Sequence, residues 1–427
     1  MEPVVGKGSR RSGLWWTLRI ASVIAVIGAY VLLRPGETSR LADTDESSVE
    51  VLGQELTPSL EAAPTPAASP TATPIPSPTP EPTVTVSMSF SGDVLSHSGV
   101  YRQALTYGVD DPADPAALQY DYRPMFSKIT DRLSAVDLSI CVLETPVSAT
   151  NEGLAGYPVF NAPRELPDAL LAVGFDGCAT ASNHSYDRGA DGVITTLDQL
   201  DRAGLRHAGM ARSADEAASP TLYAVGDVNV AHLSFTYGLN GFVLPVDRPW
   251  LVDVIDVEQI LTQARAARAA GADLVVLSIQ WGNEYDRNPT SEQIRLADEL
   301  TRSGEIDLIA GNHAHVVQPI DVVNDTWVLY GLGNLLSNQS SECCIASSQD
   351  GVLVTVTFEG LRSTGLSVVD VAIAPTWVDR SDYTIISLLD EIAQPDLDEA
   401  ARSSYIISRD RTIEAIGLLG RDIRLAE

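Results

Sequence analysis

Short apolar segments and longer amphipathic segments alternate along most of this chain. The apolar segments at 137–143 and 273–280 have the length and composition of buried strands. The segments at 190–203 and 256–270 have the apolar spacing and the polar starting residues of helices. Further helices are expected at 123–135, 167–173, 291–303 and 412–419. Because strands that alternate with helices favour a parallel sheet covered by helices, the pattern predicts an α/β core.

The pattern changes at the N-terminal end of the chain. Residues 14–33 form an apolar segment whose one charged residue is Arg19. A helix of this length spans about 30 Å, the thickness of a bilayer core. Basic residues before the segment place the N-terminus in the cytoplasm. The sequence therefore predicts a cytoplasmic tail at 1–13, an uncleaved membrane anchor at 14–33 and an extracytoplasmic body, as in a single-pass protein of the cell membrane. The alternative is a cleaved signal peptide, but no convincing cleavage site follows the segment.

The stretch that follows is rich in proline. Nine prolines lie between positions 54 and 83, among Thr, Ser and Ala. This composition cannot bury enough apolar surface to form a core, so it predicts a disordered, extended linker over 34–83. The folded body is then expected at 84–375, followed by a C-terminal helical extension at 376–427.

The amino-acid composition limits which partners the folded body is expected to bind. Hydrophobic residues make up 44% of the chain and charged residues 20%, which is typical of a globular protein. The net charge is −29, from 57 acidic and 28 basic residues. Nucleic-acid binding needs a basic surface, so we expect no nucleic-acid partner.

Four cysteines are too few for a disulfide scaffold. Cys141 and Cys178 each lie in a predicted strand, and we expect them to be buried thiols. Cys343 and Cys344 are adjacent in a polar loop, where either a vicinal disulfide or a pair of surface thiols is compatible with the sequence.

Side chains that bind metals or phosphate follow five of the predicted strands. They are Asp93, Glu144, Asn183 with His184, Gln280, and His313 with His315. The carboxyl ends of parallel strands meet at one edge of a sheet, so these groups are expected to converge. This set of oxygen and nitrogen donors suits a divalent Mn, Fe, Zn or Mg ion in a hydrolytic site.

The segment 311–319 carries two of these groups. His313 and His315 are one residue apart, and residues i and i+2 of an extended chain point the same way. Two such imidazoles can hold one metal ion or one phosphate group. The alternative is a pair of loop histidines without a ligand, and the other strand ends favour the first interpretation.

Over 86–358 the chain resembles the CapA/PgsA family of capsule and poly-γ-glutamate synthesis proteins. The resemblance rests on Phe90-Ser-Gly-Asp-Val, Leu143-Glu-Thr-Pro, Ala181-Ser-Asn-His-Ser-Tyr-Asp-Arg-Gly, Gln280-Trp-Gly-Asn-Glu-Tyr, Gly311-Asn-His-Ala-His-Val-Val-Gln and Tyr330-Gly-Leu-Gly-Asn. It implies a calcineurin-like, metallo-dependent-phosphatase-like fold: a four-layer α/β/β/α sandwich with two sheets face to face.

The resemblance also implies roles for individual residues. Asp93, Glu144, Asn183, His313 and His315 would line a metal site, with Glu144 bridging or acting as a base. His184 would be the acid or would orient a phosphate group.

This chain departs from the family pattern at several places, and two of them bear on the number of metal ions. Gln280 stands where the family usually has a histidine, and an amide oxygen is a weaker ligand for most of these metals. Leu95 stands where a second metal would need a histidine, and His97 could replace it only if a helix starts at once. One metal ion is therefore expected rather than two.

Three functions are compatible with these observations. In the first, a metal-activated water attacks a phosphoester or an amide and His184 protonates the leaving group. In the second, the protein is a non-catalytic accessory that binds an anionic polymer or its precursor beside a polymer synthase. In the third, it is a structural wall-stalk protein, which would explain the proline-rich linker but not the five strand ends.

Overall fold

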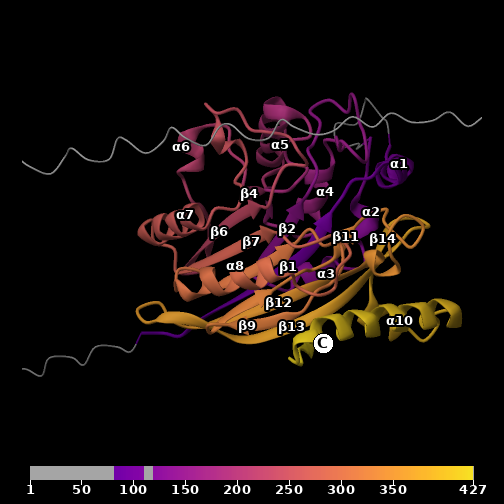
Figure 1. Cartoon of the computed structure of the whole chain (residues 1–427). Helices are drawn as coiled ribbons and strands as arrows, with labels where there is room; N and C mark the ends of the chain where they lie inside the picture. Colours follow the sequence, from indigo (N-terminus) through magenta and orange to yellow (C-terminus); the bar gives the residue numbers. More distant parts are fainter. Residues whose placement is uncertain (1–80, 110–118, 427) are drawn as a thin grey trace, which may run out of the picture. The chain divides into compact units, whose positions relative to one another are not determined.

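The computed structural model describes residues 81–109 and 119–426 (Figure 1). The predicted cytoplasmic tail, membrane anchor and nearly all of the linker lie outside these residues. Among the described residues, no helix is both long enough and apolar enough to cross a bilayer.

The first of two sheets has nine strands and mixed direction. Its order is β14-β13-β12-β1-β2-β3-β4, with β11 beside β1 and β15 beside β13. The strands are β1 Val84–Val94, β2 Leu138–Leu143, β3 Gly177–Ala179, β4 Arg206–Ala208, β11 Asn334–Leu336, β12 Asp350–Leu361, β13 Gly365–Asp379, β14 Thr384–Ser387 and β15 Arg424–Leu425. Strands β1 to β4 are parallel, whereas β12, β13 and β14 continue the sheet in antiparallel fashion.

The second sheet has six strands in the order β5-β6-β7-β8-β10-β9. They are β5 Thr221–Val225, β6 Val228–Thr236, β7 Leu274–Gln280, β8 Leu308–Asn312, β9 Ile320–Val323 and β10 Thr326–Leu329. Its central strands β6, β7, β8 and β10 are parallel. Such strands are buried on both faces, which is why they appear as nearly continuous apolar runs in the sequence.

The helices are α1 Ser98–Tyr107, α2 Arg123–Phe126, α3 Thr130–Ser134, α4 Leu166–Ala172, α5 Gly189–Ala203, α6 Ala214–Ala217, α7 Val257–Ala269, α8 Ser291–Arg302, α9 Leu388–Ile392 and α10 Glu399–Ile416; three 3-10 turns lie at Pro249–Leu251, Ala346–Gln349 and Gly417–Leu419. The polar side chain of Asp256 caps α7, and Thr290 forms a capping box with Gln293 at α8. Helix α10 runs along β12 and β13 (Figure 1).

Alternating side chains of the strands build separate cores on the two faces of each sheet. Met88 and Phe90 of β1 pack with Val276 of β7 and Leu308 of β8 in the core between the sheets. Strand residues whose side chains point to the other face of the second sheet, such as Leu277, pack against α7 and α8 on its outside. Helices α1, α2, α4 and α5 cover the first sheet in the same way. The predicted α/β class is confirmed.

Several predicted boundaries are corrected by the structure. The single helix expected at 123–135 is two short helices, α2 and α3. Strand β13 runs through position 376, where the C-terminal extension was expected to begin. The segment after that position contributes β14 and β15 to the first sheet, in addition to α9 and α10.

The prediction of two buried thiols was wrong, because Cys141 and Cys178 form a disulfide. Both are fully buried, but they lie directly opposite each other on the neighbouring parallel strands β2 and β3, with their Cα atoms 4.4 Å apart. This separation is at the short end of the range that a disulfide spans. Cys343 and Cys344 are bonded to each other, which is the vicinal disulfide alternative.

Candidate metal centre

The polar strand ends of the two sheets meet at one edge. Asp93 lies near the end of β1, where the pairing with β2 shifts register. Its backbone N–H donates to the carbonyl of Gly333, 2.9 Å away. Gly92 makes this close approach feasible, since a Cβ atom there would come within 2.3 Å of the same carbonyl oxygen. The β1 end is therefore held against the segment that leads into β11.

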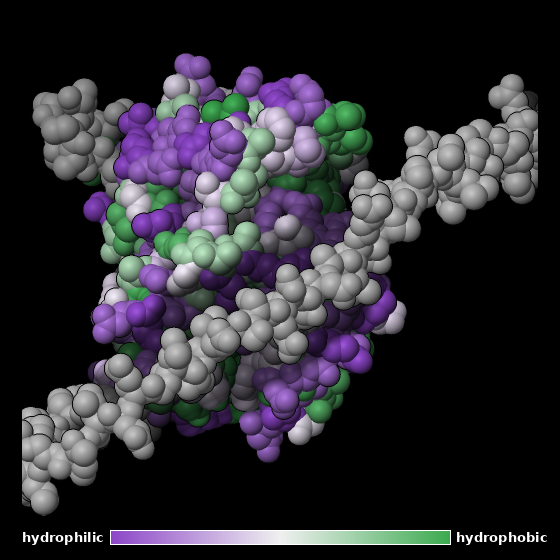
Figure 2. Space-filling view, turned by 90° about the vertical axis from the view of Figure 1, so that its left-hand side faces the viewer, coloured by the Kyte–Doolittle hydropathy of each residue, from purple (hydrophilic) through white to green (hydrophobic). Residues whose placement is uncertain are grey.

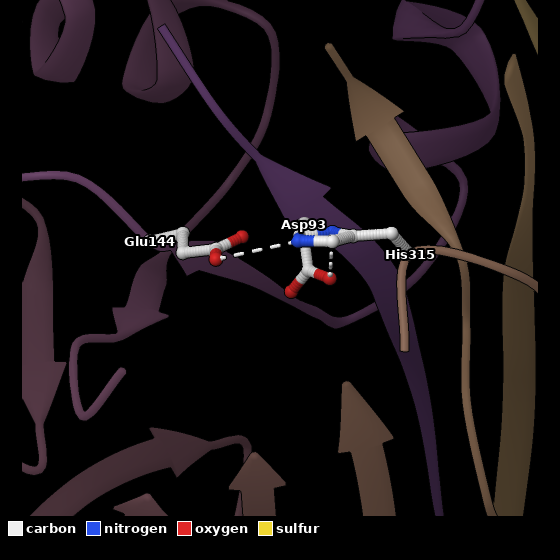
Figure 3. A group of neighbouring side chains, drawn as sticks. All are labelled: Asp93, Glu144 and His315. Carbon is white, nitrogen blue, oxygen red and sulfur yellow. Dashed lines mark ion pairs between the residues drawn. The ribbon is translucent and has the colours of Figure 1, made fainter. Parts of the chain in front are cut away.

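Asp93, Glu144 and His315 form a compact group at this edge. One ligand atom from each lies within 4.8 Å of the others. Figure 3 shows the imidazole of His315 with ion pairs to both carboxylates: Nδ1 is 3.4 Å from Asp93 Oδ2, and Nε2 is 3.8 Å from Glu144 Oε1. All three side chains are buried. Strand ends from both sheets thus contribute to one group, and three of the side chains singled out in the sequence belong to it.

The two histidines are not in the extended geometry that the sequence suggested. Strand β8 ends at Asn312, and His313 and His315 have φ angles of +91° and +55°. Residues other than glycine adopt this left-handed region at a cost, and such residues cluster at functional sites. The ring centroids are 6.0 Å apart with planes at 54°, so the rings diverge and are not parallel neighbours.

Hydrogen bonds hold the loop of the two histidines in place. The backbone N–H of His313 donates to Asp93 Oδ2 over 3.2 Å. The Nδ1 atom of His315 lies 3.0 Å from Asn334 Oδ1, an acceptor, so Nδ1 carries the hydrogen. This bond leaves Nε2 as the ring nitrogen that faces Glu144, which is the orientation a metal ligand requires.

Several buried polar atoms of the site residues predicted from the sequence have no hydrogen-bond partner. They are Asp93 Oδ1, both carboxyl oxygens of Glu144, Asn183 Oδ1 and His313 Nδ1. Buried polar atoms without partners are costly and are rare in folded proteins. Each of these atoms can donate an electron pair to a divalent cation, so the donor set fits a metal ion.

Charge also favours a cation here. Burial raises the pKa of Glu144 well above its usual value, and the nearby Asp93 carboxylate raises it further, against the opposing effect of His315. Burial lowers the pKa of His315, but the Glu144 and Asp93 carboxylates outweigh this and raise it to about 9. Burial lowers the pKa of His313 to about 3, so this ring is neutral and suited to bind a metal. A divalent cation would stabilise both acids in their charged form and would displace the proton from Nε2 of His315.

Gln280 lies at the end of β7, but its amide oxygen is already engaged. That oxygen accepts the backbone N–H of Asn183 over 2.7 Å and the hydroxyl of Thr236 over 3.1 Å. The amide nitrogen of Gln280 is the atom without a partner, and it is a donor. In this structure Gln280 therefore orients Asn183, which has the free oxygen.

His184 follows Asn183 and is buried. Its Nδ1 lies 2.8 Å from Asp187 Oδ2, and the same oxygen accepts the backbone N–H of Phe160 over 2.7 Å. The Phe160 ring packs edge-on against His184 with centroids 4.7 Å apart. Sequence reasoning missed Asp187, although a histidine followed three residues later by an aspartate was a usable signal.

His97 does precede a helix, as the two-metal alternative required. Helix α1 begins at Ser98, yet the His97 ring packs edge-on against Phe160 at 5.2 Å. Its Nδ1 accepts the backbone N–H of Asn338 over 3.3 Å. Burial lowers the pKa of His97 to about 4. Among the described residues, the metal-ligand group consists of Asp93, Glu144 and His315 and does not include His97.

Fold and site together define an α/β protein with a buried carboxylate–imidazole group that could hold a divalent metal ion. A family model described as "Bacterial capsule synthesis protein PGA_cap" matches residues 87–339, more than half of the chain. The chain belongs to this family, which confirms the resemblance seen in the sequence.

Curated relatives agree with this assignment. The chain is 30% identical over 215 residues to the capsule biosynthesis protein CapA of Bacillus anthracis, covering 49% of this chain and 50% of the relative. It is 33% identical over 178 residues to the PGA biosynthesis protein CapA of Bacillus subtilis strain 168, covering 41% and 46%. The chain thus spans about half the length of the curated relatives it matches.

Solved structures show more distant similarity. The calcineurin-like phosphoesterase YfkN of Bacillus subtilis aligns with a TM-score of 0.41 at 12% identity, covering 78% of this chain and 99% of that one. The NAD nucleotidase NadN of Haemophilus influenzae aligns with a TM-score of 0.41 at 11% identity, covering 81% and 64%.

Proposed function

We propose that this protein takes part in the biosynthesis or export of a bacterial cell-surface polymer, such as capsule or poly-γ-glutamate, as a metal-dependent hydrolase. Family membership and the names of the curated relatives support the pathway. The buried site supports the chemistry. The bond that is cleaved is a phosphoester or an amide.

One observation carries the hydrolase proposal. Buried atoms of Asp93, Glu144, Asn183 and His313, from four separate strand ends, have no hydrogen-bond partner, and Asp93 and Glu144 each have a carboxylate oxygen within 4.8 Å of a ring nitrogen of His315. Structural polar residues are normally paired, whereas a site built for a cation keeps such atoms available. Packing alone gives no reason to bury all of them at one edge.

Different residues of this chain would have different roles in the reaction. Asp93, Glu144 and His315 would hold the ion, with Asn183 and His313 as further donors. A divalent cation bound there supplies Lewis-acid polarisation of the bond to be cleaved. His184 would give a proton to the leaving group from Nε2, because its Nδ1 is committed to Asp187. Asp187 acts through His184 by fixing the orientation of that ring.

A second function is favoured by the state of Gln280. Its oxygen is used to orient Asn183, so this position offers no ligand where the family usually has a histidine. A site with fewer ligands suits a non-catalytic accessory that binds an anionic polymer or its precursor through a bridging cation. An acidic chain with net charge −29 would otherwise repel such a polymer.

Either function places the body outside the cell membrane. The apolar segment at 14–33 would anchor the chain, and the proline-rich segment at 34–83 would hold the body away from the bilayer. The partners in this proposal are the membrane and a polymer synthase.

Metal analysis of the purified full chain in detergent tests the proposal. We expect about one Mn, Fe or Zn ion per chain and turnover of a phosphoester or amide substrate. Glu144→Gln should lose both the metal and the activity. Glu258→Gln is the matched control, since Glu258 is an exposed acid far along the sequence from these ligands. A folded chain that takes up no metal and shows no activity would refute the hydrolase proposal.

His184→Asn separates the two functions. A hydrolase would lose turnover and keep its metal. An accessory protein would bind poly-γ-glutamate in a metal-dependent way, and His184→Asn would leave that binding unchanged.

A further inference from the structure

A cavity of about 660 Å³ is lined entirely by residues outside the metal centre. Its walls come from β4 at the edge of the first sheet, from β6 of the second sheet, and from α6 and α7 (Figure 1). Small-molecule sites typically have volumes of about 300–1,000 Å³ and form where elements of different layers meet. Figure 2 views the molecule from this side, which is largely hydrophilic around a recessed centre.

The backbone builds this cavity in advance. The segment after β4 bridges to the segment before α7 through Met210 and Val252, and the N–H of Asp253 donates to the carbonyl of Gly209 over 2.8 Å. Gly209 has a φ of +105°, and a Cβ atom there would come within 2.6 Å of the Ala181 side chain. Only glycine fits this position, so the two backbone segments can approach this closely.

The buried wall of the cavity offers acceptors without a cation. Asp253 is 8% exposed, and its oxygens accept only the side-chain amides of Gln259 and Gln263, at 2.7 and 3.1 Å. A carboxylate can accept about four hydrogen bonds, so capacity remains. His232 is 1% exposed, and its Nε2 lies 2.9 Å from the hydroxyl of Ser278. Its Nδ1 has no partner at all.

The exposed wall offers the opposite charge. Arg206 lines the cavity from β4 and is exposed. Its guanidinium stacks over the Tyr223 ring at 5.9 Å, and it has no ion pair among the described residues. By contrast, Arg212, which also lines the cavity, is paired with Asp198, Asp201 and Glu216. The cavity thus combines a buried carboxyl that lacks a cation with a guanidinium that lacks an anion.

We infer that this cavity binds a zwitterionic α-amino-acid head group, free or at the end of a peptide. Asp253 would accept hydrogen bonds from the ammonium, and Arg206 would bind the carboxylate. A guanidinium pairs strongly with a carboxylate because it offers several donors in one plane.

Other ligand classes fit the cavity less well. A simple anion would meet the buried Asp253, which has no neighbouring cation to offset its charge. A metal ion would need at least three donors close together, and among the described residues such a group exists only at Asp93, Glu144 and His315. The inference is independent of the hydrolase proposal, since no residue of the metal centre takes part.

Calorimetric titration of the full chain tests the inference. L-glutamate and γ-L-glutamyl-L-glutamate both carry the head group, and comparing them tells a free amino acid from a peptide end. N-acetyl-L-glutamate lacks the ammonium, and the α-amide of L-glutamate lacks the α-carboxylate. We expect each of these two analogues to bind at least roughly tenfold more weakly, the usual effect of losing a charge-assisted hydrogen bond.

Two variants and one control complete the test. Asp253→Asn should remove the discrimination between L-glutamate and its N-acetyl form. Arg206→Gln changes an exposed residue and should remove the discrimination against the α-amide. Arg265→Gln, on the exposed side of α7, should bind like the native chain. Binding should persist in EDTA, because the metal centre is separate.

Three results would overturn the inference. They are no binding of either head group at millimolar concentration, equal binding of the N-acetyl form, and loss of binding when EDTA removes metal.

Discussion

Replacing Asp253 with asparagine should stabilise the protein at pH 8 and leave its stability nearly unchanged at pH 4. Burial raises the pKa of Asp253 from 3.8 to about 6, against the opposing effect of its two glutamine partners. In the folded state the carboxyl therefore holds its proton more tightly than in the unfolded state. Asparagine resembles that protonated form in shape and charge.

The sign and the size follow from these two pKa values. Below pH 3.8 the carboxyl is protonated in both states, so burying it does not lower the free energy of unfolding. Between pH 3.8 and about 6 the unfolded state loses its proton first, so stability falls as the pH rises. Above pH 6 the carboxyl is charged in both states, and the loss of stability has reached its full size. A shift of about 2 pKa units corresponds to about 3 kcal/mol in the free energy of unfolding.

Denaturant unfolding of the full chain at several pH values between 4 and 8 measures this difference. Asp227→Asn is the control, because Asp227 is an exposed turn residue and its replacement changes the net charge by the same amount. We expect the Asp253→Asn difference to grow to about 3 kcal/mol by pH 8, whereas the control stays flat. A gain that is the same at every pH, or a loss at pH 8, would refute the reasoning.

Three further predictions concern other buried groups. Gln280→Ala should weaken Mn²⁺ affinity roughly 10–100-fold, because it removes the acceptor that holds the Asn183 backbone. Gln280→Glu keeps an acceptor there and should weaken the affinity less. Equal Mn²⁺ affinities of the two variants by titration would contradict this. Asp187→Asn should lower turnover roughly 100-fold or more at unchanged metal content, because His184 loses its charged partner; unchanged turnover would argue against that role. Burial lowers the pKa of His232 from 6.5 to about 3, so stability is lost as the pH falls below 6.5. At pH 3 the free energy of unfolding of His232→Gln should therefore exceed that of the native chain by about 4 kcal/mol, relative to the difference at pH 7. Parallel acid-unfolding curves of the two chains would contradict this.

The sequence predicted the buried elements of the fold best. Strands β2, β7 and β8 are buried on both faces and therefore stand out as apolar runs. Helices α7 and α8 have polar capping residues that mark where they begin. The 18 residues of α10 carry no comparable apolar stripe, and the sequence predicted only its end. Contacts of α10 with β12 and β13 support this helix, and those contacts are remote in sequence.

Some features of the candidate site could likewise be predicted from the sequence, and others could not. The convergence of Asp93, Glu144 and His315 could be predicted, because parallel strands place their carboxyl ends at one edge. The left-handed backbone of His313 and His315 could not, since hydrogen bonds to Asp93 and Asn334 hold that loop. The amide of Gln280 was expected to face a metal, but its direction depends on partners at Asn183 and Thr236. Such orientations come from contacts between segments far apart in the chain.

The disulfide between Cys141 and Cys178 constrains how this protein can mature. Both cysteines are fully enclosed by the packed core, so neither an oxidant nor a reductant reaches the bond once that core has closed. Oxidation therefore has to accompany or precede the closing of the core around β2 and β3. A chain that folds in a reducing compartment would bury two free thiols there and keep them. The conditions met during folding, and not those met afterwards, decide which covalent form of the protein exists.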